Sequence, residues 1–497
     1  MDLSVIYSRA LAGVDAPLVQ VETHLSNGLP AFNIVGLPET VVRESRDRVR
    51  CALLNSHFEF PDRRITVNLA PADLPKEGGR FDLPIALGIL SASGQVPGER
   101  LAQHEFVGEL ALNGTLRAVP GVVAAAGAAE REGRFLVVAP PCAPLAARVP
   151  GSRIIAATDL LTLCAHLNGA SPIPPSEPPP AGDPDGYPDM RDVAGQHAAR
   201  RVLEIAAAGG HHLLLEGPPG AGKTLMASRL PGILPPPEAQ EALTGLALRD
   251  IQDIALPCAH LLQRPFRAPH HSASAAALAG GGGRPRPGEI SLAHGGVLFL
   301  DELPEFSRHC LEMLREPLES GEITLSRARH KITYPARFQL VAAMNPCPCG
   351  YLGDPERRCR CASEQIQRYR ARISGPLLDR IDLHVQVGRV PAACLLNDAP
   401  AGEPSRAIRE RVCKARARQL QRQGCPNSQL PVSMLASTCL PGASERKAVE
   451  QAATQLQLSA RSVHRLLRVA LTISDLAGRG GVGVDHISEA LGYRGNA

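Results

Sequence analysis

The sequence GPPGAGKT, residues 217–224, matches the pattern G-x-x-x-x-G-K-[ST] at every position. It follows the apolar run HHLLLE at 211–216 and precedes LMASRL at 225–230, so we expect a strand, a glycine-rich loop and a helix. Such a loop turns its backbone N–H groups toward phosphate oxygens, and the helix N-terminus adds a favourable dipole. The residues predicted to bind nucleotide are Gly217, Pro218, Pro219, Gly220, Ala221, Gly222, Lys223 and Thr224.

The second part of the predicted site is VLFLDE, residues 297–302. Four apolar residues predict a buried parallel strand, which places Asp301 and Glu302 at its carboxyl end, where open α/β sheets bind ligands. We expect Lys223 to reach the terminal phosphates, Thr224 and Asp301 to hold Mg²⁺, and Glu302 to orient or deprotonate the attacking water. The alternative, a surface strand that ends in two acids, is disfavoured by the phosphate loop upstream. The predicted cofactors are therefore ATP and Mg²⁺.

Composition restricts the class of protein. A chain of 497 residues has room for roughly two to four domains, and 44% hydrophobic with 21% charged residues is ordinary for a soluble globular protein. The net charge of +4 permits nucleic-acid binding without requiring it. Aromatic residues at 3%, with no tryptophan, argue against a surface that stacks bases. Without a signal-like start or an apolar run of membrane-spanning length, we expect a cytoplasmic protein with no membrane contact.

Proline-rich segments predict the domain boundaries. The stretch SPIPPSEPPPAGDPDGYPD contains eight prolines, which exclude a core element and predict a semi-rigid linker over 171–190. We therefore expect an N-terminal domain over 1–170 and an α/β core over 191–390. After a weaker break at 391–405, residues 405–497 show apolar spacing of three and four, which predicts a helical domain.

Four of the thirteen cysteines, Cys347, Cys349, Cys359 and Cys361, fall within fifteen residues. Thiolates suit tetrahedral Zn²⁺, and a turn between the two pairs can bring them together, so the pattern is compatible with structural zinc. The C-x-C spacing is tighter than the usual C-x₂-C, and reduced or redox-labile thiols are the alternative. The remaining cysteines are expected to be cytosolic thiols and not a disulfide framework.

The order of the motifs resembles that of AAA+ ATPases. The segments FRAPHHSASAAALAGGGGRPRPGEISLAHGGVLFLDELPEF at 266–306 and NPCPCG…QRYRARISGPLLDRIDLHV at 345–385 are similar to those of the ComM/YifB family of the magnesium-chelatase-like branch. The similarity extends over nearly the whole chain. It implies an AAA+ core with a parallel sheet, followed by a C-terminal helical lid.

The resemblance also implies roles for single residues. Asn345 would sense the γ-phosphate, and Arg380 would be an arginine finger that acts on the site of a neighbouring subunit. A finger donated in this way requires a ring, so we expect a homo-hexamer. Arg461 is expected to be the sensor arginine of the lid, although Arg465, one turn further along the helix, could take that role instead. The alternative for either residue is an arginine on a solvated helix face with no role in the site.

The substrate is expected at two inserts that distinguish this AAA+ branch: 266–291, which is rich in Ala and Gly and contains Arg267, His270 and His271, and 322–338. The strand pair EITLSRARHKITYPARF, 322–338, concentrates Arg327, Arg329 and Lys331 at its turn, and related ring helicases point such hairpins into the central channel. Cations repeated around a ring would track a phosphate backbone without reading bases. The alternative is a solvent-facing turn. The segment 357–422 adds fifteen Lys or Arg against six Asp or Glu, part of which is expected to be a solvated helix face.

The N-terminal domain resembles the ribosomal-S5-like fold shared with Lon-type proteases. The resemblance rests on NLAPADLPKEGGRFDLPIALGIL and GELALNGTLRAVPGV, and it places Arg80 at the serine position and Val123 at the lysine position. An arginine is not a nucleophile and a valine is not a base, so we expect no peptidase activity. A binding role for a partner, DNA or the ring is the remaining expectation.

The overall expectation is an α/β protein with three parts: an S5/Lon-like domain, an AAA+ core and a helical lid. The family resemblance implies an ATP-driven hexameric DNA helicase that acts on single-stranded and branched DNA and promotes branch migration during natural transformation. A magnesium-chelatase-type motor and a protein-remodelling ATPase remain as alternatives. The first is disfavoured because the chelatase ATPase subunit lacks the Lon-like half, and the absent Ser–Lys pair disfavours only the proteolytic form of the second.

Overall fold

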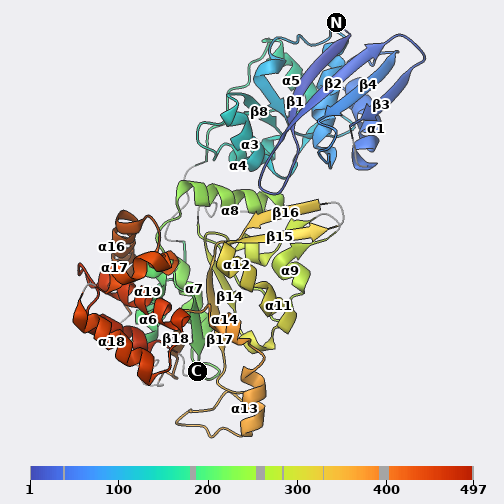
Figure 1. Cartoon of the computed structure of the whole chain (residues 1–497). Helices are drawn as coiled ribbons and strands as arrows, with labels where there is room; N and C mark the ends of the chain where they lie inside the picture. Colours follow the sequence, from blue (N-terminus) through green and yellow to red (C-terminus); the bar gives the residue numbers. More distant parts are fainter. Residues whose placement is uncertain are drawn as a thin grey trace. The chain divides into compact units, whose positions relative to one another are not determined.

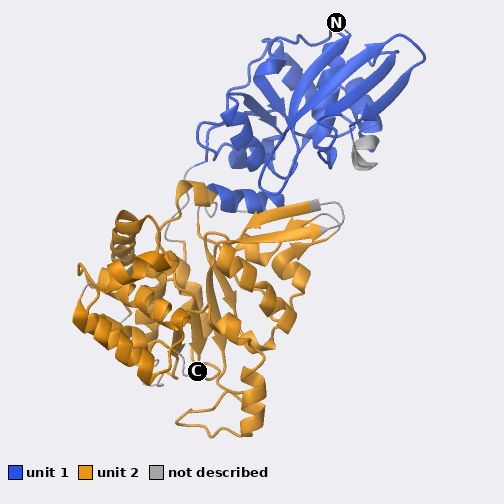
Figure 2. Cartoon of the chain, viewed as in Figure 1, with its two compact units in different colours: residues 1–182, 243–261 blue, residues 183–242, 262–497 orange. Residues whose placement is uncertain are grey.

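The computed structural model describes residues 2–36, 40–179, 186–252, 263–282, 285–327, 330–390, 402–440 and 442–494, without the side chains of 40–43, 327 and 330. The chain divides into two compact units (Figure 2). Unit 1 comprises residues 1–182 and 243–261, and unit 2 comprises residues 183–242 and 262–497. These units are not the predicted ranges: unit 1 extends to residue 182 and not 170, and residues 405–497 belong to unit 2. Residues 243–252, in the range predicted for the α/β core, belong to unit 1.

Unit 1 is built on a seven-stranded mixed sheet with the order β3-β4-β2-β1-β5-β8-β9. Strands β1, β2 and β4 pair antiparallel, whereas β1, β5, β8 and β9 run parallel. Buried and exposed positions alternate along β2 because one face of the sheet packs on the core. The strands are β1 Leu3–Arg9, β2 Leu18–Ser26, β3 Ala31–Val35, β4 Arg64–Ala70, β5 His104–Phe106, β8 Phe135–Val138 and β9 Arg153–Ala156, with the short pair β6 Glu109–Leu110 and β7 Leu116–Arg117.

The helices of unit 1 cover this sheet (Figure 1). Helix α2 is apolar almost throughout, and it is buried at every position except Ser91 because it packs on β1 and β2. Gly88 permits this close packing, since a Cβ there would lie 2.3 Å from the Thr23 hydroxyl oxygen. The helices are α1 Thr40–Asn55, α2 Asp82–Ala92, α3 Val122–Arg131, α4 Ala143–Ala146 and α5 Leu160–Leu167.

Helix α8, Ala239–Ile251, passes from unit 2 into unit 1 (Figure 2). Its residues Leu246 and Ala247 are buried in one hydrophobic cluster with residues of α3 such as Val122 and Ala126. The helix therefore completes the core of unit 1, although its sequence lies within the region that carries the phosphate loop.

Unit 2 contains a five-stranded parallel sheet with the order β11-β14-β17-β10-β18. The two apolar runs predicted as strands form β10 and β14, and every residue of β14 and of the neighbouring β17 is buried. The predicted AAA+-like core with a parallel sheet is thereby confirmed. The strands are β10 Leu213–Glu216, β11 Phe266–Arg267, β14 Val297–Leu300, β17 Gln339–Met344 and β18 Leu383–Gln386; outside this sheet lie the pairs β12 Gly280–Gly281 with β13 Arg286–Pro287 and β15 Glu322–Arg327 with β16 His330–Pro335.

The helices of unit 2 include the predicted C-terminal helical region. Helices α16 and α19 pack against α6, so strands and C-terminal helices share one hydrophobic core that includes Leu213, Phe299 and Leu466. The helices are α6 His197–Gly209, α7 Lys223–Ile233, α9 Ala275–Ala279, α10 Glu289–Leu292, α11 Arg308–Met313, α12 Arg315–Ser320, α13 Ser363–Arg370, α14 Gly375–Leu378, α16 Ser405–Gln423, α17 Val432–Cys439, α18 Ala443–Gln455, α19 Ala460–Leu476 and α20 Val484–Gly492. Within the described residues, no helix has the length and apolarity needed to span a membrane.

Candidate functional site

The phosphate-binding loop joins β10 to α7, and its glycines are required by its conformation. Gly220 and Gly222 have φ of +78° and +86°, which side chains rarely adopt. A Cβ on Gly217 would lie 2.2 Å from the Val387 carbonyl oxygen, so the loop also needs a glycine for close packing. Helix α7 then begins at Lys223, which directs its N-terminal N–H groups toward the loop.

Lys223 and Asn345 lie together, as the resemblance implied. The Lys223 ammonium donates to the carbonyl oxygens of Gly217 at 2.7 Å and Pro218 at 3.0 Å, and to the Asn345 side-chain oxygen at 3.1 Å. Burial lowers the pKa of Lys223, while Asp301 and Glu302 act in the opposite direction. Asn345 follows β17, the strand between β10 and β14, so the two motifs meet at the carboxyl edge of the sheet.

The predicted magnesium ligands also meet at this edge. The Thr224 hydroxyl donates to Asp301 at 2.6 Å, directly after strand β14. Glu302 follows with φ of +54°, a left-handed conformation that is uncommon for a residue with a side chain. A hydroxyl and carboxylate oxygens are the donors that Mg²⁺ prefers, and the loop offers N–H groups to phosphate, so these residues fit Mg²⁺ and a nucleoside triphosphate.

His271 is a further residue of the site, and its contact was not predicted. Its Nδ1 atom lies 3.0 Å from a carboxylate oxygen of Glu302. The neighbouring rings of His270 and His271 lie 4.1 Å apart, and Arg267 pairs with Glu289 at 2.6 Å, which fixes the start of the segment. The sequence showed two histidines in an Ala/Gly-rich insert, but no motif linked them to the acid of another segment.

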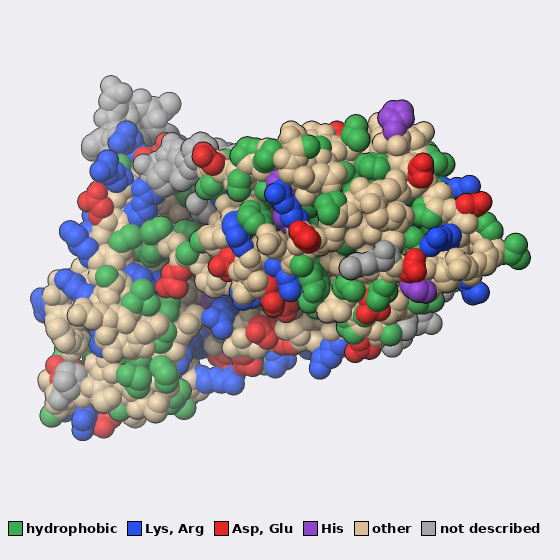
Figure 3. Space-filling model, turned by 90° about the horizontal axis from the view of Figure 1, so that it is seen from above, with side chains coloured by type: hydrophobic (Ala, Val, Ile, Leu, Met, Phe, Trp, Pro, Cys, Tyr) green, Lys and Arg blue, Asp and Glu red, His purple; other side chains and the backbone are tan. Residues whose placement is uncertain are grey.

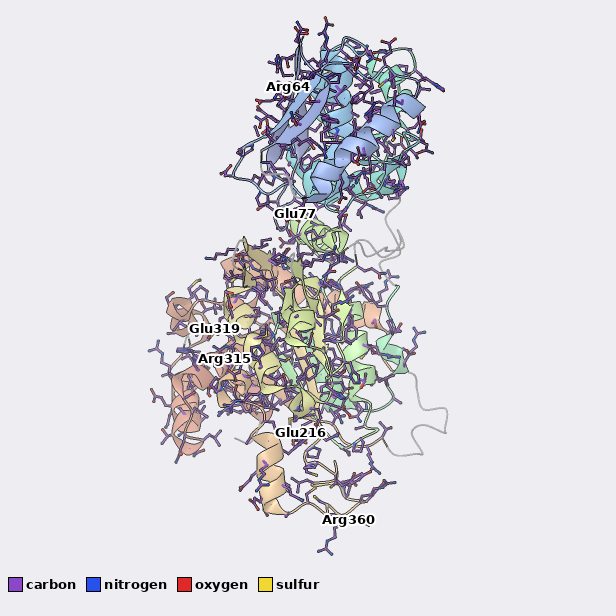
Figure 4. All side chains as sticks on the ribbon, turned by 90° about the vertical axis from the view of Figure 1, so that its right-hand side faces the viewer. Arg64, Glu77, Glu216, Arg315, Glu319 and Arg360 are labelled. Atoms are coloured by element: carbon purple, nitrogen blue, oxygen red, sulfur yellow. The ribbon has the colours of Figure 1, made fainter. Side chains whose placement is uncertain are left out.

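The three predicted arginines have different surroundings. Arg380 follows α14 and pairs with Glu319 of α12, so its side chain is largely buried within its own chain. Arg461 is exposed, with a distant contact of 3.9 Å to the same Glu319, which Figure 4 labels. Arg465 donates to the Ile381 carbonyl oxygen at 2.7 Å and contacts Asp379 at 3.3 Å. Of the two lid candidates, Arg465 is the one that contacts residues 379–381, the segment that contains Arg380 and precedes β18.

The four clustered cysteines come together in space. Cys347, Cys349, Cys359 and Cys361 have sulfur atoms that all lie within 4.8 Å of one another. They occupy the loop between Asn345 and α13, which projects from unit 2 (Figure 1). The grouping has the donors and the size of a metal site.

The predicted DNA-binding hairpin forms as two strands. Strands β15 and β16 pair antiparallel, with Thr324 and Thr333 hydrogen-bonded across them at 3.1 Å. Its base is anchored by buried Tyr334, whose hydroxyl donates to the Pro285 carbonyl oxygen at 2.9 Å. Lys331 is exposed on β16. The side chain of Arg327 and the whole of Arg329 lie outside the described residues.

The basic segment 357–422 is less available to DNA than its charge suggested, because acids from elsewhere pair with it. Arg370 pairs with Glu216 and Arg372 with Glu305, both at 2.8 Å. Further ion pairs join Arg380 to Glu319, Arg389 to Asp354, Arg411 to Glu204 and Arg422 to Asp475. Acidic and basic side chains are likewise interspersed over much of the face shown in Figure 3. Acids outside the segment therefore neutralise part of the local excess of positive charge.

Arg80 and Val123, at the positions of the protease-like pair, lie near one another in unit 1. The Arg80 guanidinium donates to the carbonyl oxygens of Pro120 and Arg9, and burial lowers its pKa to about 10. The Val123 N–H donates to the Asp250 carboxylate of α8 at 2.9 Å. This region is thus filled by Arg80 and closed by Asp250.

Comparison with known proteins shows similarity over nearly the whole chain. The families described as "Magnesium chelatase, subunit ChlI", "Subunit ChlI of Mg-chelatase" and "Magnesium chelatase, subunit ChlI C-terminal" match residues 189–395, 21–141 and 402–494. The chain is 50% identical to "Competence protein ComM" of Haemophilus influenzae over 99% of its own length and 98% of that protein. It belongs to the ComM/YifB family of magnesium-chelatase-like AAA+ proteins.

Two further relatives show how far the similarity extends. "Uncharacterized protein YifB" of Salmonella typhimurium is 49% identical over 99% of this chain and 97% of its own length. The chloroplastic magnesium-chelatase subunit ChlI-1 of Arabidopsis thaliana is 30% identical, but over only 22% of this chain. Membership of this AAA+ family indicates ATPase activity with ATP and Mg²⁺ as cofactors, which the residues around Lys223 and Asp301 fit.

Proposed function

We propose that this protein is an ATP-driven, hexameric DNA motor that promotes branch migration of recombination intermediates. The observation that carries the proposal is end-to-end 50% identity with a competence protein, together with an intact nucleotide site. Competence concerns the uptake of DNA, and a motor that extends paired regions would act on DNA after its entry. The single-stranded and branched forms are the proposed substrates.

The chain's own residues supply each part of ATP hydrolysis. The loop N–H groups and Lys223 would bind the phosphates, and Thr224 with Asp301 would hold the metal ion. Bound Mg²⁺–ATP supplies the phosphoryl group that water attacks. Glu302 accepts a proton from that water, and Asn345 reports the occupied site to β17, which lies beside both β10 and β14.

The proposed ring rests on Arg380. Within one chain this arginine pairs with Glu319 and not with the phosphate loop. In a hexamer it would leave Glu319 and stabilise charge at the site of the adjacent subunit, an effect of about 10³-fold or more on turnover. Hairpins β15–β16, repeated around the ring, would hold the phosphate backbone through Lys331 and its basic neighbours.

A chelatase-type motor is the second candidate, favoured by the family descriptions. The similarity to a chloroplastic chelatase subunit covers only about a fifth of the chain, whereas the similarity to the competence protein is complete. A protein-remodelling ATPase would share the nucleotide site but not the response to DNA.

ATPase rates with and without DNA test the proposal. We expect single-stranded and branched DNA to stimulate hydrolysis by the full-length protein, and Lys223→Ala to abolish it with every substrate. The exposed residue Lys447 of α18 offers a matched control, since Lys447→Ala should leave both rates unchanged. Activity that Lys223→Ala removes but DNA leaves unaltered would sink the DNA-motor proposal while keeping the nucleotide site.

A further inference from the structure

We propose that Cys347, Cys349, Cys359 and Cys361 bind one Zn²⁺ ion as a mononuclear tetrathiolate, and that this ion holds their loop against the phosphate-binding loop. The inference concerns a site separate from the nucleotide ligands. It does not depend on the proposed action on DNA.

The sulfur geometry fits a single tetrahedral ion. Cys347 and Cys349 have sulfur atoms 3.4 Å apart, and Cys359 lies 3.6 Å from each of them. Zinc–sulfur bonds of about 2.3 Å at tetrahedral angles separate the sulfur atoms by about 3.8 Å. The observed distances are far longer than a disulfide bond of about 2.04 Å. They are too short to enclose the irons and sulfides of a cluster.

Backbone groups around the sulfur atoms also suit thiolates. The Cys361 N–H donates to the sulfur of Cys359 at 3.5 Å, and backbone N–H groups of Tyr351 and Arg360 bond to Cys349. Such donors stabilise negative sulfur and orient the ligands of a metal. Cys347 is fully buried and the other three are partly buried, so the site is sheltered without being sealed.

The loop between the two pairs is closed by its own contacts. Gly350 donates its N–H to the Cys347 carbonyl oxygen at 2.9 Å, which turns the chain after the first pair. Asp354 accepts the N–H groups of Glu356 and Arg357, both at 2.9 Å, and pairs with Arg389 at 3.2 Å. These turns bring the second pair back to the first. They reduce the conformational entropy that ion binding must overcome.

Zinc is the ion that this donor set favours. Soft thiolates select zinc over magnesium or calcium, which prefer oxygen. Four protein ligands complete a tetrahedral shell, so no position remains for water or substrate and the site is structural. Arg360, between the last two cysteines, points away from the body of the molecule (Figure 4). Its charge therefore faces solvent and not the sulfur cluster.

The site is joined to the nucleotide-binding residues by direct packing. A Cβ on Gly350, which has φ of +83°, would lie 2.6 Å from the Pro219 ring of the phosphate loop. Asn345, whose side chain accepts from Lys223, stands two residues before Cys347. Arg370 of α13, beyond the last cysteine, pairs with Glu216 at the end of β10. A metal ion at the cysteines would therefore hold the segment 345–370 in place around the phosphate loop and the end of β10, which it contacts through Asn345, Gly350 and Arg370.

Metal content of the purified full-length protein tests the site. Under reducing conditions, elemental analysis should give about one zinc per chain. The double variant Cys359→Ser/Cys361→Ser should fall to less than one tenth of that. The matched control Cys413→Ser/Cys425→Ser changes two partly exposed cysteines elsewhere and should keep its zinc. Zinc that is absent after growth with added Zn²⁺, or equal in both variants, would overturn the proposal.

Two measurements on the unaltered protein guard against a misfolded variant. Four thiols should resist alkylation until a chelator removes the ion, and Co²⁺ put in place of zinc should give the absorption of tetrahedral tetrathiolate cobalt. Uniform alkylation with and without chelator would contradict the site. Zinc removal should also weaken binding of an ATP analogue at least fivefold. An unchanged affinity in zinc-free protein would overturn the bracing role.

Discussion

Glu302 is held by a histidine from a different segment, and this contact constrains its chemistry. The contact with His271 fixes the Glu302 side chain away from alternative positions, including those from which it would reach the attacking water. Because both side chains are partly exposed, the pair is worth only about 0.5–1 kcal/mol. An interaction of this strength can break and form again during each turnover.

Removal of this contact should raise the basal rate. His271→Ala is expected to increase ATP hydrolysis without DNA by about two- to fivefold, the equivalent of ~0.5–1 kcal/mol. Steady-state ATPase measurements test this, with His309→Ala, at an exposed position of α11, as a control. A rate that instead drops to the level of Glu302→Gln would show that His271 is required for hydrolysis and does not restrain it.

Asp250 gives the stability of unit 1 a dependence on pH. Burial raises its pKa from 3.8 to about 6, although the N–H of Val123 and the charge of Arg80 oppose the shift. The folded state thus favours the protonated form. The contribution of Asp250 to stability is complete below about pH 4 and is lost as pH rises to about 6.

Asp250→Asn should remove this dependence. Relative to wild type, we expect the variant to gain about 1–2 kcal/mol between pH 4.5 and pH 7.5, because it never carries the buried charge. Urea unfolding followed by circular dichroism measures this, and Asp485→Asn, at an exposed position of α20, is the control. The same stability difference at both pH values would contradict the assigned cause.

At this scale, motifs predicted the residues that are local in sequence. GPPGAGKT and VLFLDE identify Lys223 and Asp301 because each motif directly follows, or ends, a strand whose carboxyl end faces the nucleotide site. His271 could not be linked to Glu302, since the contact depends on how an Ala/Gly-rich insert folds back on β14. The arginines differ for another reason: sequence position did not show that Arg380 and Arg461 share Glu319.

Among the elements, hairpin β15–β16 carries the proposed contact with DNA. Its base is fixed by Tyr334 and Ile323, both buried, whereas Lys331 near the turn is exposed. A cation on a rigid arm binds phosphate without sequence preference.

Lys331→Ala should weaken DNA binding and leave DNA-free ATP hydrolysis unchanged. The slope of log affinity against log salt should fall by about 0.7 for each phosphate of a single strand that the variant no longer neutralises. Fluorescence anisotropy with labelled oligonucleotides at several salt concentrations measures the slope. Lys414→Ala, on an exposed position of α16, is the comparison. Equal slopes for the two variants would place the DNA elsewhere.

Elements with strong patterns were predicted, and elements whose partners lie far away in the chain were not. The strands β10 and β14 are apolar runs beside the two motifs, and the spacing in α19 and α20 predicted helices. Helix α8 shows an apolar face, but nothing in its sequence reveals that Leu246 packs in unit 1. The charge of 357–422 was similarly misleading, because its acidic partners lie outside the segment.

For the whole molecule, the proposed ring makes the nucleotide site a joint property of two subunits. Arg380→Ala should bind ATP normally but hydrolyse it about 10³-fold more slowly. If the arginine acts on a neighbour, mixing Arg380→Ala with Lys223→Ala should restore activity, since some interfaces then combine an intact loop with an intact finger. Titration of one variant into the other measures this. Activity that never exceeds the sum of the separate variants would argue against action between subunits.

Family membership is shown over nearly the whole chain, and the DNA-motor function is a proposal built on it. The most direct test is branch migration itself, followed by fluorescence on a synthetic four-way junction with the wild-type protein and Glu302→Gln. We expect wild type to separate the junction into products only when ATP and Mg²⁺ are present, and Glu302→Gln to bind ATP and the junction without converting it. Junctions that stay intact in the presence of a hexamer actively hydrolysing ATP would rule out a branch-migration motor.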